Sequence, residues 1–143
     1  MRLIGRRTLL AVLVNILAVM GTRLAAWGAV LDEHKRRFVE AAFAMKDKAE
    51  RSGDQAYGAV VVRGAAIVGW GPSRVIAKHD WNAHAEREAI RDAQAALGAD
   101  LAGCVMYSTS RPCVNCERAA AEAGIMRMYF GAEATDAGVP RRS

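Results

Sequence analysis

Two short clusters of metal-binding side chains constrain this chain more than any other feature of its sequence. One is His84-Ala85-Glu86, and the other is Cys113-Val114-Asn115-Cys116, which follows Pro112. Each cluster falls where the residue pattern predicts the start of a helix. When Cys-x-x-Cys begins a helix, both sulfurs lie on one face, and the helix dipole and free N–H groups favour the thiolates that bind metal. The sequence therefore predicts a metal site built on two helix starts.

The ligands in these clusters are typical of catalytic zinc. One imidazole and two thiolates, from His84, Cys113 and Cys116, fill three of the four positions of a tetrahedral ion and leave the fourth for water. Zinc lowers the pKa of such a water toward about 7. Glu86, two residues after the histidine, would not ligate the same ion but can lie beside the water and move protons. A Cys-x-x-Cys redox dithiol and a structural zinc site are the alternatives that these residues leave open.

The rest of the sequence predicts strands that alternate with helices. Runs of β-branched and aromatic residues predict the strands, and apolar residues at helical spacing between charges predict the helices. In chain order we expect a helix at 30–52, strands at 57–62 and 66–70, a helix at 84–97, a strand at 105–108, a helix at 113–124 and a strand at 127–131. This alternation predicts a layered α/β sandwich.

The N-terminal segment has the pattern of an export signal. Three arginines within the first seven residues precede an uncharged apolar stretch at residues 8–22, which is too short to span a bilayer comfortably. Because the twin arginines resemble the signal of the export pathway for folded proteins, we expect an exported, periplasmic protein. Residues 1–28 are then the signal, and residues 29–143 are the zinc domain. The alternatives are an uncleaved anchor, with membrane contact through residues 8–22, and the first helix of a cytoplasmic protein.

The excess of positive charge lies in this same segment. The chain has 20 basic and 15 acidic residues, which give a formal net charge of +5. Residues 1–28 hold four arginines and no acid, so residues 29–143 hold 16 basic and 15 acidic residues and carry a net charge of +1. A nearly neutral domain disfavours a nucleic-acid partner and favours a small molecule. The hydrophobic share of 52% supplies a core and excludes a disordered chain.

The two metal-binding clusters also form a recognisable signature. His-x-Glu at one helix start, a strand, and Pro-Cys-x-x-Cys at the next helix start are typical of zinc deaminases. The sequence resembles the cytidine and deoxycytidylate deaminase superfamily, and within it the bacterial guanine deaminases and tRNA-adenosine deaminases. The resemblance covers about Phe38 to Val139 and rests on YGAVVV, NAHAE, YSTSRPCVNC and MYFGAEATDAG. It implies a three-layer α/β/α cytidine-deaminase-like fold with a central mixed sheet, preceded here by the N-terminal hydrophobic segment, and a homodimer.

The resemblance also implies a reaction. By it, the three predicted ligands hold Zn²⁺, and Glu86 shuttles protons while water replaces an exocyclic amino group of a base and ammonia leaves. The implied partner is a small-molecule nucleobase or nucleoside. We therefore expect a zinc-dependent aminohydrolase.

Residues for substrate binding are also implied by the resemblance. In guanine deaminases an aspartate at the place of Asp136 recognises the base, and a carboxylate can accept two parallel hydrogen bonds that guanine offers and adenine does not. Ser73 stands where the family usually carries a substrate-binding asparagine. Trp81, three residues before the histidine ligand, offers an aromatic face for a bound base. Ala85 completes the expected set, and guanine is the favoured substrate.

Other functions stay open at this point. Ser73 in place of the asparagine, and Arg111 in place of a frequent glutamate, depart from the family pattern and leave the substrate undecided. A tRNA-adenosine deaminase or a cytosine or cytidine deaminase is the alternative enzyme. A deaminase-fold protein that binds zinc without catalysis is the alternative of another class.

Overall fold

A computed structural model describes residue 20 and residues 32–142 of the chain. Apart from Met20, the segment 1–28 lies outside the described residues, so the predicted export signal, its boundary and the localisation stay predictions. By its internal contacts the chain divides into residues 1–34 and 35–143, and the fold described here is that of the second unit. None of the helices among the described residues is both long and apolar enough to cross a membrane.

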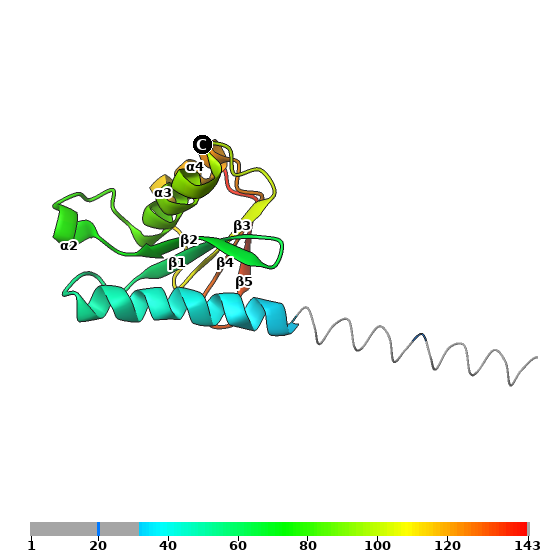
Figure 1. Ribbon diagram of the computed structural model, residues 1–143, viewed down its shortest axis with the longest axis horizontal. Helices are drawn as coiled ribbons and strands as arrows, with labels where there is room; N and C mark the ends of the chain where they lie inside the picture. Colours follow the sequence, from blue (N-terminus) through cyan, green and yellow to red (C-terminus); the bar gives the residue numbers. More distant parts are fainter. Residues whose placement is uncertain (1–19, 21–31, 143) are drawn as a thin grey trace, which may run out of the picture. The chain divides into compact units, whose positions relative to one another are not determined.

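A five-stranded mixed sheet forms the centre of the second unit (Figure 1). The strand order is β2-β1-β3-β4-β5, and only the β3–β4 pair is parallel. The strands are β1 (Gly58–Arg63), β2 (Ala66–Pro72), β3 (Cys104–Ser108), β4 (Arg127–Phe130) and β5 (Thr135–Gly138). The predicted mixed sheet is therefore confirmed.

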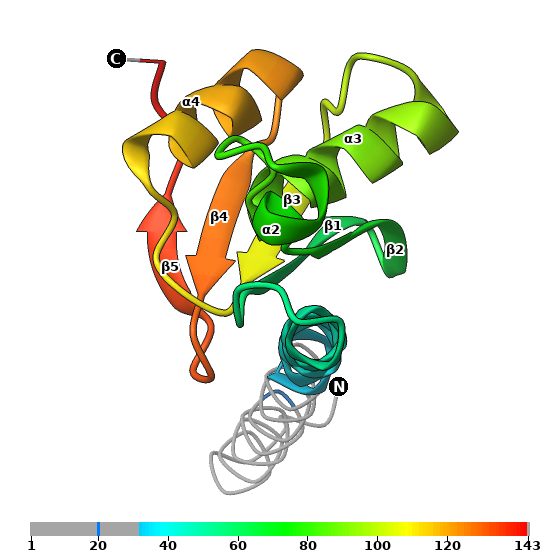
Figure 2. The ribbon, with the colours of Figure 1, turned by 90° about the vertical axis from the view of Figure 1, so that its left-hand side faces the viewer.

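Helices cover both faces of this sheet (Figure 2). The helix at residues 35–51 packs on one face, and α3 (Ala85–Leu97) and α4 (Val114–Ala123) pack on the other. A single-turn helix, α2 (Val75–Lys78), lies between β2 and α3 in the chain. The three-layer arrangement predicted from the family resemblance is therefore present.

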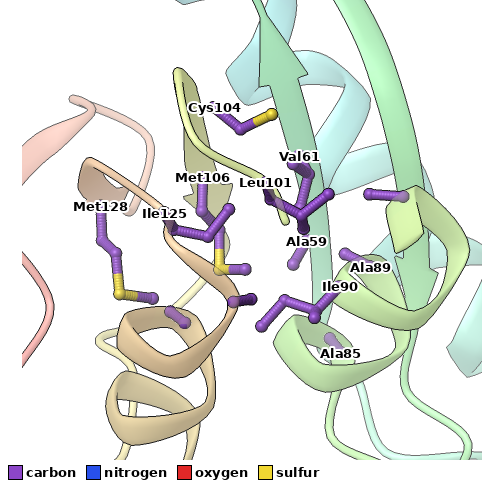
Figure 3. Packing of buried hydrophobic residues seen from close by; sticks show 13 residues of the cluster. Ala59, Val61, Ala85, Ala89, Ile90, Leu101, Cys104, Met106, Ile125 and Met128 are labelled. Carbon is purple, nitrogen blue, oxygen red and sulfur yellow. The ribbon is translucent and has the colours of Figure 1, made fainter. Parts of the chain in front are cut away.

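The alternating side chains of β1 separate two hydrophobic cores. Ala59 and Val61 belong to a cluster with α3 and α4 (Figure 3), whereas Val60 and Val62 belong to a cluster with Phe38 of the 35–51 helix. Successive side chains of a strand point to opposite faces, so an unbroken apolar run such as GAVVV suits a strand that is buried on both sides. β1 is this buried strand, with β2 and β3 as its neighbours.

Two glycines of β2 let α3 approach the sheet closely. A Cβ at Gly69 would lie 2.2 Å from the carbonyl oxygen of Ala89, and one at Gly71 would lie 2.0 Å from that of Ala85. Neither space can hold a methyl group, because carbon and oxygen atoms that are not bonded need more than 3 Å. Since Ala85 is the first residue of α3, this packing sets the position of the helix start that carries the first metal-binding cluster.

Two elements of the structure were not predicted. β5 has no run of β-branched residues, and its backbone is ordered by pairing with β4, where Tyr129 faces Asp136. α2 has only four residues, and its free N–H groups at Ile76 and Ala77 donate to the Asp54 carboxylate at 3.0 and 2.9 Å. α2 depends on a partner more than twenty residues away and β5 depends on strand pairing across a short hairpin, and neither contact is revealed by the residue pattern of the element itself.

Candidate active site

The starts of α3 and α4 bring the two sequence clusters together. His84 is the N-cap residue of α3, and Cys113 is the N-cap residue of α4. The backbone N–H of Cys116 donates to the sulfur of Cys113 at 3.4 Å, so the cysteine caps the helix as a serine or aspartate would. Both helices lie on the same face of the sheet (Figure 2), and their first turns meet.

The three predicted ligand atoms lie at distances that suit zinc. His84 Nδ1 is 3.4 Å from Cys116 Sγ and 3.7 Å from Cys113 Sγ. All three ligand atoms lie within 4.8 Å of one another. Zinc bonds of about 2.3 Å to sulfur and about 2.0 Å to nitrogen give a tetrahedral N···S edge of about 3.6 Å. The donor set and its spacing therefore fit a tetrahedral zinc ion with a fourth position free of protein ligands.

The two thiols lie in different surroundings. Cys116 is completely buried, whereas Cys113 is exposed. Burial, with the nearby charge of Glu86, raises the pKa of the Cys116 thiol far above its ordinary value. A thiol with a raised pKa stays protonated at neutral pH and is a poor metal ligand until a cation lies beside it. A cation beside the sulfur would ionise it, as a metal site requires.

Glu86 is a buried carboxyl group beside the ligands. Its side chain is only 6% exposed, and Oε2 accepts a hydrogen bond from Cys116 Sγ at 3.6 Å. Burial raises the pKa of Glu86 above its ordinary value, although the hydrogen bonds and the nearby His84 act in the opposite direction. A carboxyl group with a raised pKa holds a proton closer to neutral pH, which is the property of a proton shuttle.

A cavity of about 420 Å³ opens beside these groups. Its volume falls within the range of pockets that bind drug-sized molecules. The lining residues come from the two helix starts and from the segments that flank β1 and β3, and they are Gln55, Tyr57, His84, Ala85, Glu86, Ser110, Arg111 and Cys113. Of the residues expected to bind substrate, Ala85 is the one that the structure places in this lining.

The other three residues expected to bind substrate lie elsewhere. Ser73 is completely buried, and its hydroxyl donates to Asp54 Oδ1 at 2.9 Å. Trp81 is 80% exposed and lines a neighbouring cavity of about 400 Å³, which shares Gln55 with the first. Asp136 is exposed on β5, where both carboxylate oxygens accept from Nε of Arg127 at 2.9 Å. The structure therefore does not gather these three side chains around the metal ligands.

Sequence reasoning overlooked four residues of the cavity lining. Gln55 and Tyr57 precede β1, and Ser110 and Arg111 follow β3 within two or three residues of its end. Tyr57 belongs to the quoted motif YGAVVV, Ser110 and Arg111 belong to the quoted motif YSTSRPCVNC, and Gln55 lies two residues before the first of them, so their place in or beside the motifs was a usable signal. What the sequence could not show is that β1 and β3 are antiparallel neighbours, which places the start of one strand beside the end of the other.

Residues 32–132 match the family described as the cytidine and deoxycytidylate deaminase zinc-binding region. The match covers well over half of the chain, so the protein belongs to this family. Zinc is thus the metal for which His84, Cys113 and Cys116 form the site. The resemblance expected from the motifs is confirmed.

A guanine deaminase and a tRNA-specific adenosine deaminase are among the relatives of this chain. The chain is 40% identical over 82 residues to the guanine deaminase of Bacillus subtilis (strain 168), a match that covers 57% of this chain and 53% of the relative. It is 36% identical over 89 residues to the tRNA-specific adenosine deaminase of Buchnera aphidicola subsp. Schizaphis graminum (strain Sg), which covers 62% and 59%. The chain spans a little over half the length of these curated relatives.

A solved structure shares the fold described above. It comes from a study of A-to-I editing by tRNA:A34 deaminases at the wobble position of transfer RNA. The two chains superpose with a TM-score of 0.65 and are 33% identical, and the match covers 67% of this chain and 75% of the other. The cytidine-deaminase-like fold inferred from the sequence is therefore confirmed for the described zinc domain.

Proposed function

We propose that this protein is a zinc-dependent hydrolytic deaminase of a nucleobase or nucleoside, with guanine as the first candidate. The observation that carries the proposal is the position of Glu86. Its buried carboxyl group lies in the wall of the cavity, beside three ligand atoms that are spaced for zinc. A structural zinc site has no need of a buried acid with a raised pKa next to an open cavity.

The overall reaction replaces an amino group with oxygen. Water adds at the ring carbon that bears the exocyclic amine, the carbon–nitrogen bond breaks, and ammonia leaves. Zinc held by His84, Cys113 and Cys116 would supply a Lewis acid that makes water a stronger nucleophile near neutral pH. The remaining work consists of proton transfers and of holding the base.

Glu86 is the group that can move these protons. Its carboxylate would accept a proton from the attacking water, pass it to a ring nitrogen, and later protonate the leaving amine. Glu86 lines the cavity and its Oε2 contacts Cys116 Sγ, so the carboxyl group lies beside both the metal ligands and the space for a base. The burial that raises its pKa lets it return to the protonated form between steps.

The choice of guanine rests on the likeness to the Bacillus subtilis guanine deaminase. Asp136, which the resemblance assigned to base recognition, is paired with Arg127 and does not line the cavity, so it adds no support. The near-neutral charge of residues 29–143 favours a small substrate over a nucleic acid. A tRNA-adenosine substrate is the competing outcome of the same test.

An ammonia-release screen tests the proposal. Zinc-loaded protein is incubated with guanine, adenine and cytosine, with their nucleosides and nucleoside monophosphates, and with a tRNA anticodon stem-loop. We expect release from guanine or its nucleoside, and a loss of about a thousandfold in the Glu86→Gln variant with zinc content unchanged. Glu122→Gln, an exposed acid on α4 outside the cavity, is the matched control and should retain wild-type turnover. Wild-type turnover in Glu86→Gln, or zinc binding without turnover of any substrate, would overturn the proposal.

Assembly and export belong to the same proposal. A homodimer predicts twice the mass of the chain in light scattering, and export predicts recovery from the periplasmic fraction. A monomeric mass, or protein found only in the cytoplasm, would contradict the respective expectation.

A further inference from the structure

Arg111 gives the cavity an unusual positive charge. Among the residues that line the cavity it is the one lysine or arginine, and it is exposed to solvent. It precedes Pro112 and Cys113, so it lies next to the metal-binding cluster in the chain. The family resemblance leads one to expect a glutamate at this position, which would carry the opposite charge.

The backbone that carries Arg111 is held in place by the sheet. The N–H of Thr109 donates to the carbonyl of Gly58 at 2.9 Å, and the Thr109 hydroxyl accepts from the N–H of Gly58 at 3.1 Å. The hydroxyl of Ser108 donates to the carbonyl of Ser110 at 2.8 Å. The segment between β3 and α4 is therefore hydrogen-bonded to the start of β1. These bonds fix the backbone position just before Arg111.

The side chain itself rests on an aromatic ring. The guanidinium carbon of Arg111 lies 5.7 Å from the ring centroid of Phe130, within the range of a cation–π contact. Such a contact restricts the side chain but uses none of its N–H groups. The N–H donors of the guanidinium thus stay available to a ligand in the cavity.

No acid neutralises Arg111 within the part of the chain that the structure describes. The charge of Arg111 acts on Glu117, but the Glu117 carboxylate accepts from Nε of Arg141 at 3.0 Å. That hydrogen bond is the main cause that lowers the pKa of Glu117, and the charge of Arg111 adds to it. Two arginines therefore face one carboxylate, and a net positive charge remains beside the cavity.

We propose that Arg111 binds a phosphate group and directs the enzyme to nucleotides in preference to free bases. This inference rests on the proposed deaminase function. The planar guanidinium fork can donate two parallel hydrogen bonds to a phosphate, a pairing that lysine does not reproduce. The cavity of about 420 Å³ has room for more than a single base ring. A phosphate at Arg111 would occupy the exposed edge while the base reaches Glu86 and the metal ligands.

Equilibrium binding tests this assignment without relying on turnover. Calorimetry on the zinc-loaded Glu86→Gln protein compares guanosine 5′-monophosphate with guanosine. We expect the monophosphate to bind more tightly, and Arg111→Ala to reduce the affinity ratio of the two ligands about tenfold, the effect of losing one charge-assisted contact. Arg118→Ala is the matched control, because Arg118 is an exposed arginine of α4 that does not line the cavity.

Three further measurements sharpen the assignment. Arg111→Lys keeps the charge but loses the fork, so the affinity ratio should fall part of the way. Raising the salt concentration should weaken binding of the monophosphate more than binding of guanosine, since salt screens the charged contact. A single-stranded oligonucleotide identifies the source of the phosphate. Tighter binding of the oligonucleotide than of the monophosphate, again dependent on Arg111, would support phosphate recognition and assign the phosphate to a nucleic acid.

Failure of this inference can be told apart from failure of the proposed function. If neutral bases or nucleosides are deaminated but the affinity ratio is the same in wild-type, Arg111→Ala and Arg118→Ala backgrounds, the inference is wrong and the deaminase function stands. An equal affinity for guanosine and its monophosphate in the unsubstituted Arg111 background also overturns it. If no substrate is deaminated but Arg111 still selects the phosphate, the inference stands and the function is wrong.

Discussion

The metal ligands and the residues expected to bind substrate behave in opposite ways in this structure. His84, Cys113 and Cys116 come from two helix starts and place their ligand atoms within 4.8 Å of one another. Ser73 and Asp136 were expected at the same site from the same family resemblance, yet each is hydrogen-bonded to another side chain, Asp54 and Arg127 respectively. The difference shows that the chemistry of this fold is built on its regular elements, while its specificity depends on the loops and edges around them.

The physical reason lies in how each group is held. The ligands stand on helix starts whose positions follow from helix and sheet packing, and close packing tolerates little variation. The residues expected to bind substrate, Ser73 and Asp136, lie in a loop and on an edge strand. Their contacts therefore depend on the path of the loop and on the pairing of the strand. Four substitutions test this comparison, from the metal cluster outward.

The largest effect is expected at the metal cluster itself. Cys116→Ala removes one of three protein ligands and should lower zinc content from about one ion per chain to almost none, with loss of all turnover. Elemental analysis after dialysis against a weak chelator measures it. Cys104→Ala is the matched control, because Cys104 is an equally buried cysteine that packs in the hydrophobic core. Its zinc content should stay normal, and equal zinc loss in both variants would contradict the assigned ligand set.

The next effect tests whether sheet packing sets the position of the ligands. In Gly71→Ala the new methyl group would lie 2.0 Å from the Ala85 carbonyl oxygen, so the start of α3 must move. We expect a loss of about 3 kcal/mol in the free energy of unfolding and a weaker zinc affinity. Gly64→Ala, at a turn with φ +60° and nothing within 4 Å of the new Cβ, should cost only about 1 kcal/mol of strain and leave zinc affinity intact. Unchanged zinc affinity in Gly71→Ala would show that packing of α3 on β2 does not set the position of the metal ligands.

A smaller effect is expected where Asp54 holds the loop that contains Ser73. Its buried carboxylate accepts from the Ser73 hydroxyl and from the N–H groups of Gln55, Ile76 and Ala77. Asp54→Asn should cost about 2 kcal/mol at pH 7, since an amide cannot accept at all of these sites. Chemical denaturation measures the loss. Ser73→Ala, which removes one of the four donors, should cost about 1 kcal/mol.

The pH dependence of this effect has a definite sign. Burial raises the pKa of Asp54, but the four hydrogen bonds together lower it below its ordinary value. A lowered pKa in the folded state means that the carboxylate contributes stability above its unfolded pKa of about 3.9, and that this stability is lost as the pH falls toward the folded pKa. The stability difference between wild type and Asp54→Asn should therefore be largest near neutral pH and shrink below about pH 4. A difference that grows on acidification would contradict it.

The smallest effect is expected at Asp136. The residue is exposed, its charge is taken up by Arg127, and it does not line the cavity. Asp136→Asn should change KM for guanine by less than about twofold, the scale of an exposed ion pair. Steady-state kinetics on the zinc-loaded protein measures it. An increase in KM of a hundredfold would show that Asp136 contacts the base. The conclusion that Asp136 lies outside the substrate site would then be wrong.

Most of the fold was predictable because its patterns are local. The strand GAVVV, the alternation in α3 and the helix at residues 35–51 each carry their own periodicity, and the structure confirms them. α2 and β5 were missed, because a four-residue helix and the segment TDAG have no local signal of their own. Their backbones are ordered by contacts with other segments, α2 by the Asp54 carboxylate and β5 by pairing with the neighbouring strand β4.

The sequence by itself determined the chemical class of the site. Spacing of three residues at a helix start places the Cys113 and Cys116 side chains on one face, and together with His84-Ala85-Glu86 this pair forms the deaminase signature, so all four residues could be assigned without coordinates. Only the tertiary structure decided which polar side chains reach the cavity. It buried Ser73 against Asp54, paired Asp136 with Arg127, and placed Arg111 in the lining with no carboxylate bonded to it among the described residues. These outcomes depend on contacts between different segments of the folded chain. A buried or paired polar side chain is committed to the hydrogen-bond partner that the fold places beside it, and residue type alone does not reveal that partner.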